Sequence, residues 1–170
     1  RTTIDTLDYS GSGWNEGSKV VVACCGAPKR TLKAELPANF DLAEGFSNPK
    51  FVQKGILAIQ SPDYKNESWG TATAHQISTH LTKYDTSSIP LVILCDDSDF
   101  VSQNVNNFVW ATFTRANPSH DIYGTSSFIQ HKHWGCKHTL IIDARKKPHH
   151  APELVPDATV SAKVDAFFKS

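Results

Sequence analysis

Short apolar runs, separated by polar stretches that contain glycine and proline, dominate the chain. Four of these runs predict strands, at residues 19–25, 55–60, 89–95 and 140–143. Continuous runs of Val, Ile and Leu are typical of parallel strands that are buried on both faces of a sheet. The third run is the clearest, because an unbroken aliphatic segment follows a proline-containing turn.

Apolar residues at helical spacing predict three helices, at about residues 68–84, at 101–112 and at 160–168. Asp96 to Asp99 precede the second of these and offer side chains that cap a helix. Residues 28–54 are punctuated by Pro, Gly and Asn, which predicts a long connection with at most short helices. Strands that alternate with helices and loops indicate a three-layer α/β domain with a mainly parallel sheet.

Length and charge narrow the classes of protein to which the chain can belong. Its 170 residues fit one domain spanning 1–170, with the Thr-, Ser- and Gly-rich residues 1–18 leading into the first strand. Lys and Arg number 17, as do Asp and Glu, which argues against a surface built mainly to bind nucleic acid or an anionic membrane. No apolar stretch approaches the ~20 residues of a membrane span, and no signal peptide opens the chain. The chain starts at Arg1 and contains no Met, so we expect a piece of a longer polypeptide.

Four cysteines bear on the cellular compartment: Cys24, Cys25, Cys95 and Cys136. They show no spacing of the kind found in secreted disulfide frameworks. Cys25 and Cys95 each end an apolar run, where cysteine usually acts as a small buried hydrophobe. We therefore expect a reducing, cytoplasmic compartment.

Acidic residues follow the third and fourth predicted strands, where sites gather in parallel sheets. Asp96, Asp97 and Asp99 come after one strand, and Asp143 ends the next. Carboxylates from neighbouring strand ends can bind a divalent cation. The simpler interpretation is that these residues cap a helix and compensate its dipole.

A histidine-rich segment lies between the third and fourth of these strands. It contains His131, His133, Cys136 and His138, all of them residue types that bind zinc. Their spacing matches no standard zinc module, and we expect His131 and His133 to share one face of a strand, with Cys136 beyond a turn at Gly135. A polar loop near a cleft or an interface is the simpler interpretation. Further along, Arg145-Lys146-Lys147 and His149-His150 form a cationic patch that could dock a phosphate or an acidic partner subunit.

The stretch from Trp110 to Asp121 is the most distinctive one. Arg115 stands where a predicted helix meets Asn-Pro, so it can pair with Asp96, Asp97 or Asp121, or contact a substrate directly. The ion pair is the simpler interpretation. The candidate cleft residues are Thr112, Phe113, Thr114, Arg115, His131 and His133.

These segments resemble the C-terminal region of the UbiD family of decarboxylases. The resemblance rests on residues 89–97, on Trp110-Ala111 with Thr114-Arg115, on a proline three residues further, and on Asp121. Gly135-Cys136-Lys137 and Ile142-Asp143-Ala144-Arg145-Lys146 resemble the family's ending. The likeness covers most of the second half of the chain, and the first half is similar only in layout.

The resemblance implies reversible, non-oxidative decarboxylation of aromatic or α,β-unsaturated acids, in a family that serves ubiquinone and menaquinone biosynthesis. The family uses prenylated flavin mononucleotide with a divalent metal, both bound in a preceding domain. No residue of this chain matches the family's catalytic or metal-binding residues. We therefore expect a C-terminal domain that by itself binds no cofactor and no metal. It is expected to pack on an N-terminal flavin-binding domain of the same chain, to close the cleft of that domain and to support a homo-oligomer. Decarboxylase activity is expected only of the parent chain, and nucleic acid is not an expected partner.

Two other classes of function remain open. A metal-dependent hydrolase or transferase would use Asp96, Asp97 and Asp143 with the cluster of His131, His133 and Cys136. A pure assembly module would instead form a stable dimer and have no small-molecule site.

Overall fold

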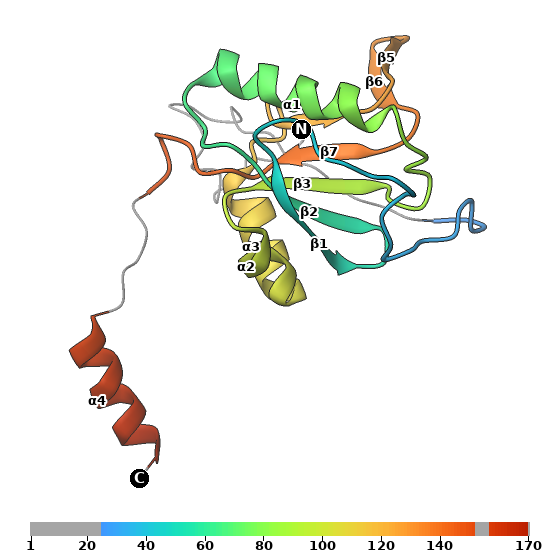
Figure 1. Ribbon diagram of the computed structural model, residues 1–170. Helices are drawn as coiled ribbons and strands as arrows, with labels where there is room; N and C mark the ends of the chain where they lie inside the picture. The colour runs from blue at the N-terminus through green and yellow to red at the C-terminus, as the bar shows by residue number, and fades with distance from the viewer. Residues whose placement is uncertain (1–24, 152–156, 170) are drawn as a thin grey trace, which may run out of the picture.

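The computed structural model describes residues 25–151 and 157–169 (Figure 1). Residues 1–18 and nearly all of the strand predicted at 19–25 lie outside these ranges. The elements, in chain order, are β1 (Ser47–Gln53), β2 (Ile56–Gln60), α1 (Glu67–Leu81), β3 (Leu91–Cys95), α2 (Ser98–Gln103), α3 (Val105–Arg115), β4 (Ile122–Gly124), β5 (Ser127–Gln130), β6 (His133–Cys136), β7 (Leu140–Asp143) and α4 (Ala158–Lys169).

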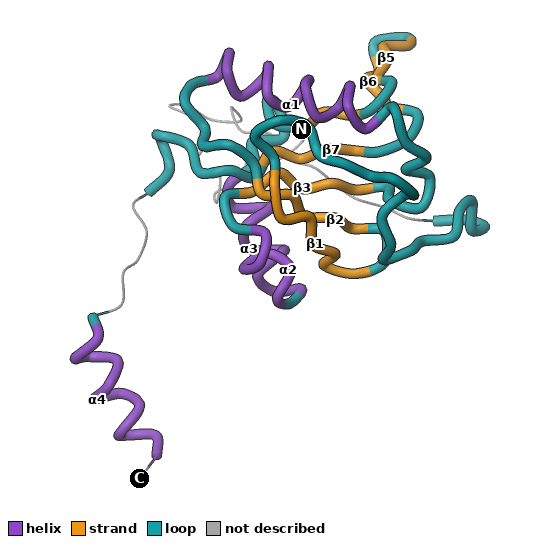
Figure 2. Tube along the Cα trace, in the orientation of Figure 1, coloured by secondary structure: helices purple, strands orange, loops and turns teal. Residues whose placement is uncertain are grey.

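A five-stranded sheet with the order β1-β2-β3-β7-β4 forms the centre of the fold (Figure 2). The three central strands β2, β3 and β7 are parallel, and both edge strands run antiparallel to their neighbours. Ala58, Ile93 and Ile142 lie at the same level across the three central strands. The predicted α/β class with a mainly parallel sheet is confirmed.

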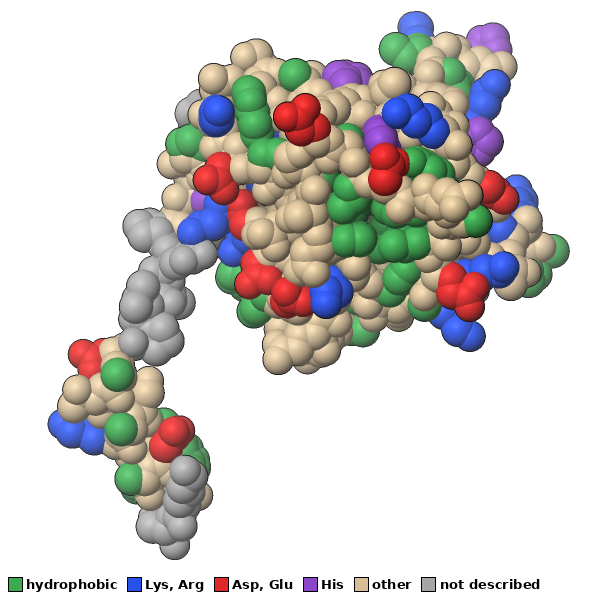
Figure 3. All heavy atoms as spheres, in the orientation of Figure 1, with side chains coloured by type: hydrophobic (Ala, Val, Ile, Leu, Met, Phe, Trp, Pro, Cys, Tyr) green, Lys and Arg blue, Asp and Glu red, His purple; other side chains and the backbone are tan. Residues whose placement is uncertain are grey.

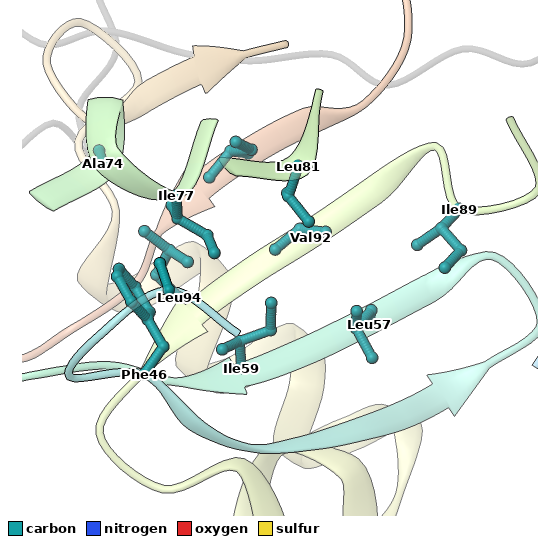
Figure 4. Close-up of a cluster of buried hydrophobic side chains, with 11 residues drawn as sticks. Phe46, Leu57, Ile59, Ala74, Ile77, Leu81, Ile89, Val92 and Leu94 are labelled. Atoms are coloured by element: carbon teal, nitrogen blue, oxygen red, sulfur yellow. The ribbon is translucent and has the colours of Figure 1, made fainter. Parts of the chain in front are cut away.

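Helices cover both faces of the sheet, which gives three layers (Figure 1). Successive side chains of a strand point to opposite faces, so the continuous aliphatic runs supply two cores at once. On one face, Ala74, Ile77 and Leu81 of α1 pack over β2 and β3 (Figure 4). On the other face, the second core comprises Ala58, Ile93, Ile142, Val101, Phe108 and Ala111, the last three from α2 and α3.

The region predicted as one helix over residues 101–112 is two helices, and this prediction was wrong. Asn104 adopts an extended backbone conformation (φ −161°, ψ 166°), and its side chain accepts a hydrogen bond from the backbone N–H of Asn107. It therefore ends α2 and caps α3. Asp97 caps α2 in the same way, because its carboxylate accepts a hydrogen bond from the N–H of Phe100.

Residues 28–54, predicted to hold no strand, contain the edge strand β1. Its sequence includes Pro49, and Asn48 has a positive φ of 47°, so the register against β2 shifts between Ser47 and Lys50. Proline and an irregular register are tolerated at a sheet edge, where one side of the strand has no ladder to maintain. The search for apolar runs missed β1 because this strand is mostly polar and lies at the edge of the sheet, next to β2.

The histidine-rich segment is a β-hairpin formed by β5 and β6. His131 and Lys132 form its turn, with φ values of 48° and 67°, whereas His133 begins β6. The two histidines therefore do not share one face of a strand, and Gly135 lies within β6 rather than in a turn. The expected geometry failed because the turn comes at His131, four residues earlier in the chain than the one expected at Gly135.

The cysteines differ in exposure. Cys95 is fully buried, and burial raises the pKa of its thiol to about 12. Cys25, predicted to be buried, is an exposed free thiol. Cys136 is a free thiol of intermediate exposure, and the structure does not describe Cys24.

The closing helix predicted at residues 160–168 is α4. Its apolar side chains, Val160, Val164, Phe167 and Phe168, are between 48% and 80% exposed. Neither α4 nor any other helix in the described ranges is long and apolar enough to cross a membrane.

Candidate functional site at the strand ends

The chain leaves β2 and β3 toward opposite faces of the sheet, to α1 and to α2 respectively (Figure 1). Open α/β sheets bind ligands at such a point, outside the carboxyl ends of the strands. Here the fully buried side chain of Arg145 bridges the loops that follow β2 and β7. Its guanidinium donates to the carbonyl oxygen of Pro62 at 2.9 Å and to both carboxylate oxygens of Asp143, at 2.9 Å and 2.6 Å.

Two aromatic rings lie against this guanidinium. The Cζ atom of Arg145 is 5.5 Å from the ring centroid of Tyr64 and 5.3 Å from that of Trp69. Lys147 Nζ lies 5.4 Å from the Tyr64 ring, and Lys65 Nζ lies 5.2 Å from the Trp69 ring. Cations and rings thus alternate along this edge, an arrangement that stabilises buried positive charge.

A second buried cation, Lys147, joins the end of α3 to the segment that follows β7. Its ammonium donates to the carbonyl oxygens of Arg115, Asp143 and Arg145 at 3.0–3.3 Å. It also pairs with Asp121 at 3.2 Å. Burial raises the pKa of Asp121, although the hydrogen bond from the backbone N–H of Asn117 and the charge of Lys147 oppose that shift.

Arg115 makes the ion pair that its position at a helix end predicts, and its partner is Asp96. Arg115 Nη1 lies 2.9 Å from Asp96 Oδ2, which also accepts a hydrogen bond from the backbone N–H of Lys146. The guanidinium lies 5.3 Å from the ring centroid of Trp110. The end of α3 is thereby tied both to the end of β3 and to the segment after β7.

Two cavities flank these ion pairs. The smaller, of about 420 Å³, is lined in part by Tyr64, Thr71, His120, Asp121, Tyr123 and Lys147. The larger, of about 680 Å³, is lined in part by Asp96, Asp97, Phe100, Trp110, Arg115 and His150. Burial lowers the pKa of His150, and the neighbouring cations add to that shift. Both volumes are within the range of small-molecule sites.

The predicted cleft residues do not come together. Thr114 and Arg115 line the larger cavity, Phe113 is about half exposed on α3, and Thr112 is fully buried. His131 and His133 lie on the β5–β6 hairpin, which joins the end of β4 to the start of β7. They therefore lie at the amino ends of the parallel strands, whereas Arg115 lies at the carboxyl ends.

The three carboxylates predicted as metal ligands each make another contact. Asp97 caps α2, Asp96 binds Arg115, and Asp143 binds Arg145. Within residues 25–151 and 157–169, no three His, Cys, Asp or Glu side chains are placed to hold a metal ion. The described residues thus do not assemble the donor set of a metal-dependent hydrolase.

Sequence reasoning missed the buried role of Arg145 and Lys147, which it interpreted as part of an exposed cationic patch. Their fractional exposures are 0% and 7%. A usable signal was present, since Asp143, Arg145 and Lys147 alternate directly after a buried strand. Residues two apart point to the same side of an extended chain. Three alternating charges of mixed sign at a strand end therefore favour a buried ion-pair network.

Thr112 carries the first of our predictions. Its Oγ1 atom is buried and has no hydrogen-bond partner among the residues that the structure describes. An unpaired buried hydroxyl costs roughly 1–3 kcal/mol, so Thr112→Val is expected to raise the free energy of unfolding by about 1 kcal/mol, as measured by urea denaturation. Thr114→Val is the control, because the Thr114 hydroxyl donates to the carbonyl oxygen of Trp110 and should show no such gain. A clear loss of stability in Thr112→Val would contradict the prediction.

No family model matches the chain. The chain is 29% identical over 171 residues to a Chlamydia pneumoniae protein named as a subunit of 4-hydroxybenzoate decarboxylase, a match that covers 96% of this chain and 26% of that protein. It is 28% identical over 169 residues to an uncharacterized protein of Chlamydia trachomatis serovar D, covering 99% of this chain and 27% of that protein.

Among solved structures, the chain resembles vanillic acid decarboxylase of Sedimentibacter hydroxybenzoicus in its open form, with a TM-score of 0.42 and 16% identity over 67% of this chain and 27% of that one. The chain spans about a quarter of the length of the curated relatives it matches. Along nearly its whole length, therefore, the chain is similar to part of a protein named as belonging to a decarboxylase.

Proposed function

We propose that the chain is the C-terminal domain of a UbiD-type, non-oxidative decarboxylase and serves that enzyme by closing its cleft and by assembly. The observation that carries the proposal is the similarity, over 96% of the chain, to the Chlamydia pneumoniae protein named for 4-hydroxybenzoate decarboxylase. Aromatic or α,β-unsaturated acids are the proposed substrate class of the whole enzyme, in ubiquinone or menaquinone biosynthesis. The proposed compartment is the cytoplasm.

The residues on which the UbiD resemblance rests have a structural role that supports this proposal. Asp143 and Arg145 pair in the interior, and Arg115 pairs with Asp96 while its guanidinium lies over the ring of Trp110. These contacts brace the carboxyl ends of the parallel strands into one surface with two cavities. A rigid surface of this kind is suited to pack against a second domain and to exclude water from a cleft.

In the family that the chain resembles, prenylated flavin mononucleotide binds in a preceding domain, and no residue lining the two cavities at the strand ends matches that site. The position where an open α/β sheet would take a ligand is filled by the side chain of Arg145. We therefore assign the cofactor and its divalent metal to the preceding domain, where the bound flavin would act as the electron sink for the loss of carbon dioxide. This chain contributes no proton-transfer step in the proposal.

Exposed apolar side chains on α2 and α3 support the assembly part of the proposal. Phe100, Val105, Val109, Trp110 and Phe113 are each between 40% and 52% exposed. Several large apolar side chains exposed on two neighbouring helices favour a protein–protein contact. We propose that the N-terminal domain of the same chain or a neighbouring protomer of a homo-oligomer covers it.

The proposal predicts that residues 1–170 alone do not decarboxylate 4-hydroxybenzoate, whereas the full-length protein supplied with prenylated flavin does. The physical reason is that this chain supplies a covering surface and the preceding domain supplies the reacting groups. Release of carbon dioxide measures the activity, and equilibrium dialysis measures flavin binding. Turnover by residues 1–170 alone, or tight binding of flavin to them, would contradict the assignment of the catalytic residues to the preceding domain. An inactive full-length protein would contradict the decarboxylase proposal itself.

A further inference from the structure

The β5–β6 hairpin differs from the rest of the molecule in its charge. Residues 122–142 contain no Asp or Glu, although the whole chain balances 17 acidic against 17 basic residues. The same segment carries Lys132 and Lys137, together with His131, His133 and His138. Every residue from 126 to 134 is exposed. The hairpin projects from the body of the domain, and Figure 3 shows basic, histidine and hydrophobic side chains together at this projection.

Large apolar side chains lie among these lysine and histidine residues. Ile129 and Trp134 are directly opposite each other in the two strands, so they share one face of the hairpin. Ile129 is 78% exposed and Trp134 is 46% exposed. On the other face, Phe128 lies across Gly135, where a Cβ atom would come within 2.8 Å of its ring, and it too is 41% exposed. Both faces therefore present apolar surface to water.

The turn has an unusual composition for its geometry. Both of its central residues, His131 and Lys132, have positive φ values, as a type I′ turn requires. Asn-Gly is the sequence that suits this turn, because side chains with a branched or long Cβ substituent are strained there. Local strain that persists in a structure points to a function for the side chains that cause it. Here the strain places one lysine and one histidine at the tip.

A rigid base holds this tip in place. Thr125 and Thr139 exchange hydrogen bonds through the Thr125 hydroxyl and through their backbone groups. Thr139 also donates to the carbonyl oxygen of Ile89, beside β3. Cys136 packs directly on Gly124, where a Cβ atom would come within 2.4 Å of the Cys136 Cβ. These contacts fix the base of the hairpin to the sheet.

We propose that the tip of the β5–β6 hairpin, formed by Ile129, His131, Lys132 and Trp134, docks the protein on the surface of an anionic lipid bilayer. Tryptophan and an aliphatic side chain enter the boundary between headgroups and hydrocarbon, while lysine contacts the anionic headgroups. Ile129 favours lipid over nucleic acid, because an aliphatic side chain offers no ring on which a base can stack. The proposal is independent of the decarboxylase proposal, since it concerns a surface at the amino ends of the parallel strands and not the site at their carboxyl ends.

Sedimentation with vesicles tests the proposal on the full chain. Vesicles of equal parts phosphatidylcholine and phosphatidylglycerol are expected to bind the protein, more weakly as salt is added, whereas vesicles of phosphatidylcholine alone should bind at least about fivefold more weakly. Tryptophan emission should shift to the blue on binding, and Trp134→Phe should abolish that shift. Equal binding to both vesicle types, or no binding to either, would overturn the proposal.

A matched set of variants separates the role of the tip from its folding. The double variant His131→Asn with Lys132→Gly installs the preferred turn sequence, so the melting temperature should stay the same or rise while binding falls about fivefold. Ile129→Thr keeps a β-branched strand residue and should weaken binding about tenfold. Lys65→Gln is the control, because it removes a lysine from the loop after β2, at the carboxyl ends of the parallel strands, and should leave vesicle binding unchanged. Unchanged vesicle binding by the double variant would overturn the proposal. Binding to polyglutamate as strong as binding to the anionic vesicles, with no shift of Trp134 emission, would also overturn it and would point to an acidic protein as the partner.

Discussion

Replacing Arg145 with methionine is expected to lower the free energy of unfolding by about 3–5 kcal/mol, the range seen when one partner of a buried ion pair is removed. Methionine fills a similar volume but leaves the Asp143 carboxylate in the interior without its two guanidinium hydrogen bonds. The carbonyl oxygens of Pro62 and Gly70 lose a donor at the same time. Urea denaturation of the full chain, followed by circular dichroism, measures the loss.

Two controls distinguish a buried unpaired charge from simple loss of packing. The double variant Asp143→Leu with Arg145→Met removes both charges and should recover most of the stability, because apolar pairs of similar volume commonly replace buried ion pairs without loss. Lys50→Met breaks the exposed pair between Lys50 and Asp99 and should change the free energy of unfolding little. If Arg145→Met were as stable as the wild type, the buried pair would contribute nothing to the fold.

Replacing Lys147 with methionine is expected to cost a similar amount at neutral pH, about 3–5 kcal/mol by the same reasoning. Lys147 pairs with Asp121, which is 5% exposed, and donates to the backbone carbonyl oxygens of Arg115, Asp143 and Arg145. Its removal leaves a buried carboxylate without its cation. The measurement is again urea denaturation, now repeated over a series of pH values.

The pH dependence gives this second prediction its test. Burial already raises the pKa of Asp121, and losing the charge of Lys147 raises it further. A carboxyl whose folded-state pKa lies above its unfolded value binds more protons in the folded state. The variant should therefore gain stability as the pH falls through the raised pKa and lose it as the pH rises.

A second substitution at the same site controls for this titration. Adding Asp121→Asn to Lys147→Met removes the titrating group, and its stability should not show this dependence on pH. A deficit in Lys147→Met that stayed constant from acidic to neutral pH would contradict the prediction.

The sequence predicted the central strands because burial on both faces requires continuous aliphatic residues. Val92, Ile93 and Leu94 alternate between two cores, and no other element tolerates such a run at that length. Edge elements obey weaker rules. The register of β1 shifts around Asn48, and the hairpin turns at His131 and Lys132 rather than at the Asn-Gly pair that this turn prefers. Tertiary context decided these elements, so local patterns did not reveal them.

The site was only partly predictable for a different reason. The position of Arg115 at a helix end anticipated an ion pair but not which carboxylate would complete it. Choosing Asp96 over Asp121 depends on how α3 lies against β3, which is a long-range property. The burial of Arg145 and Lys147 depends on Tyr64 and Trp69, about 80 residues earlier in the chain. Judged by residue type alone, Arg145 and Lys147 were predicted to lie at the surface.

The bridging side chain of Arg145 also affects how the domain opens. It connects the loop after β2, the first turn of α1 and the end of β7, so none of the three can separate while its hydrogen bonds remain. Local fluctuations that expose one of these segments must break contacts to the other two. Hydrogen exchange of the amides in all three segments should therefore report one shared free energy of opening, as a single cooperative unit.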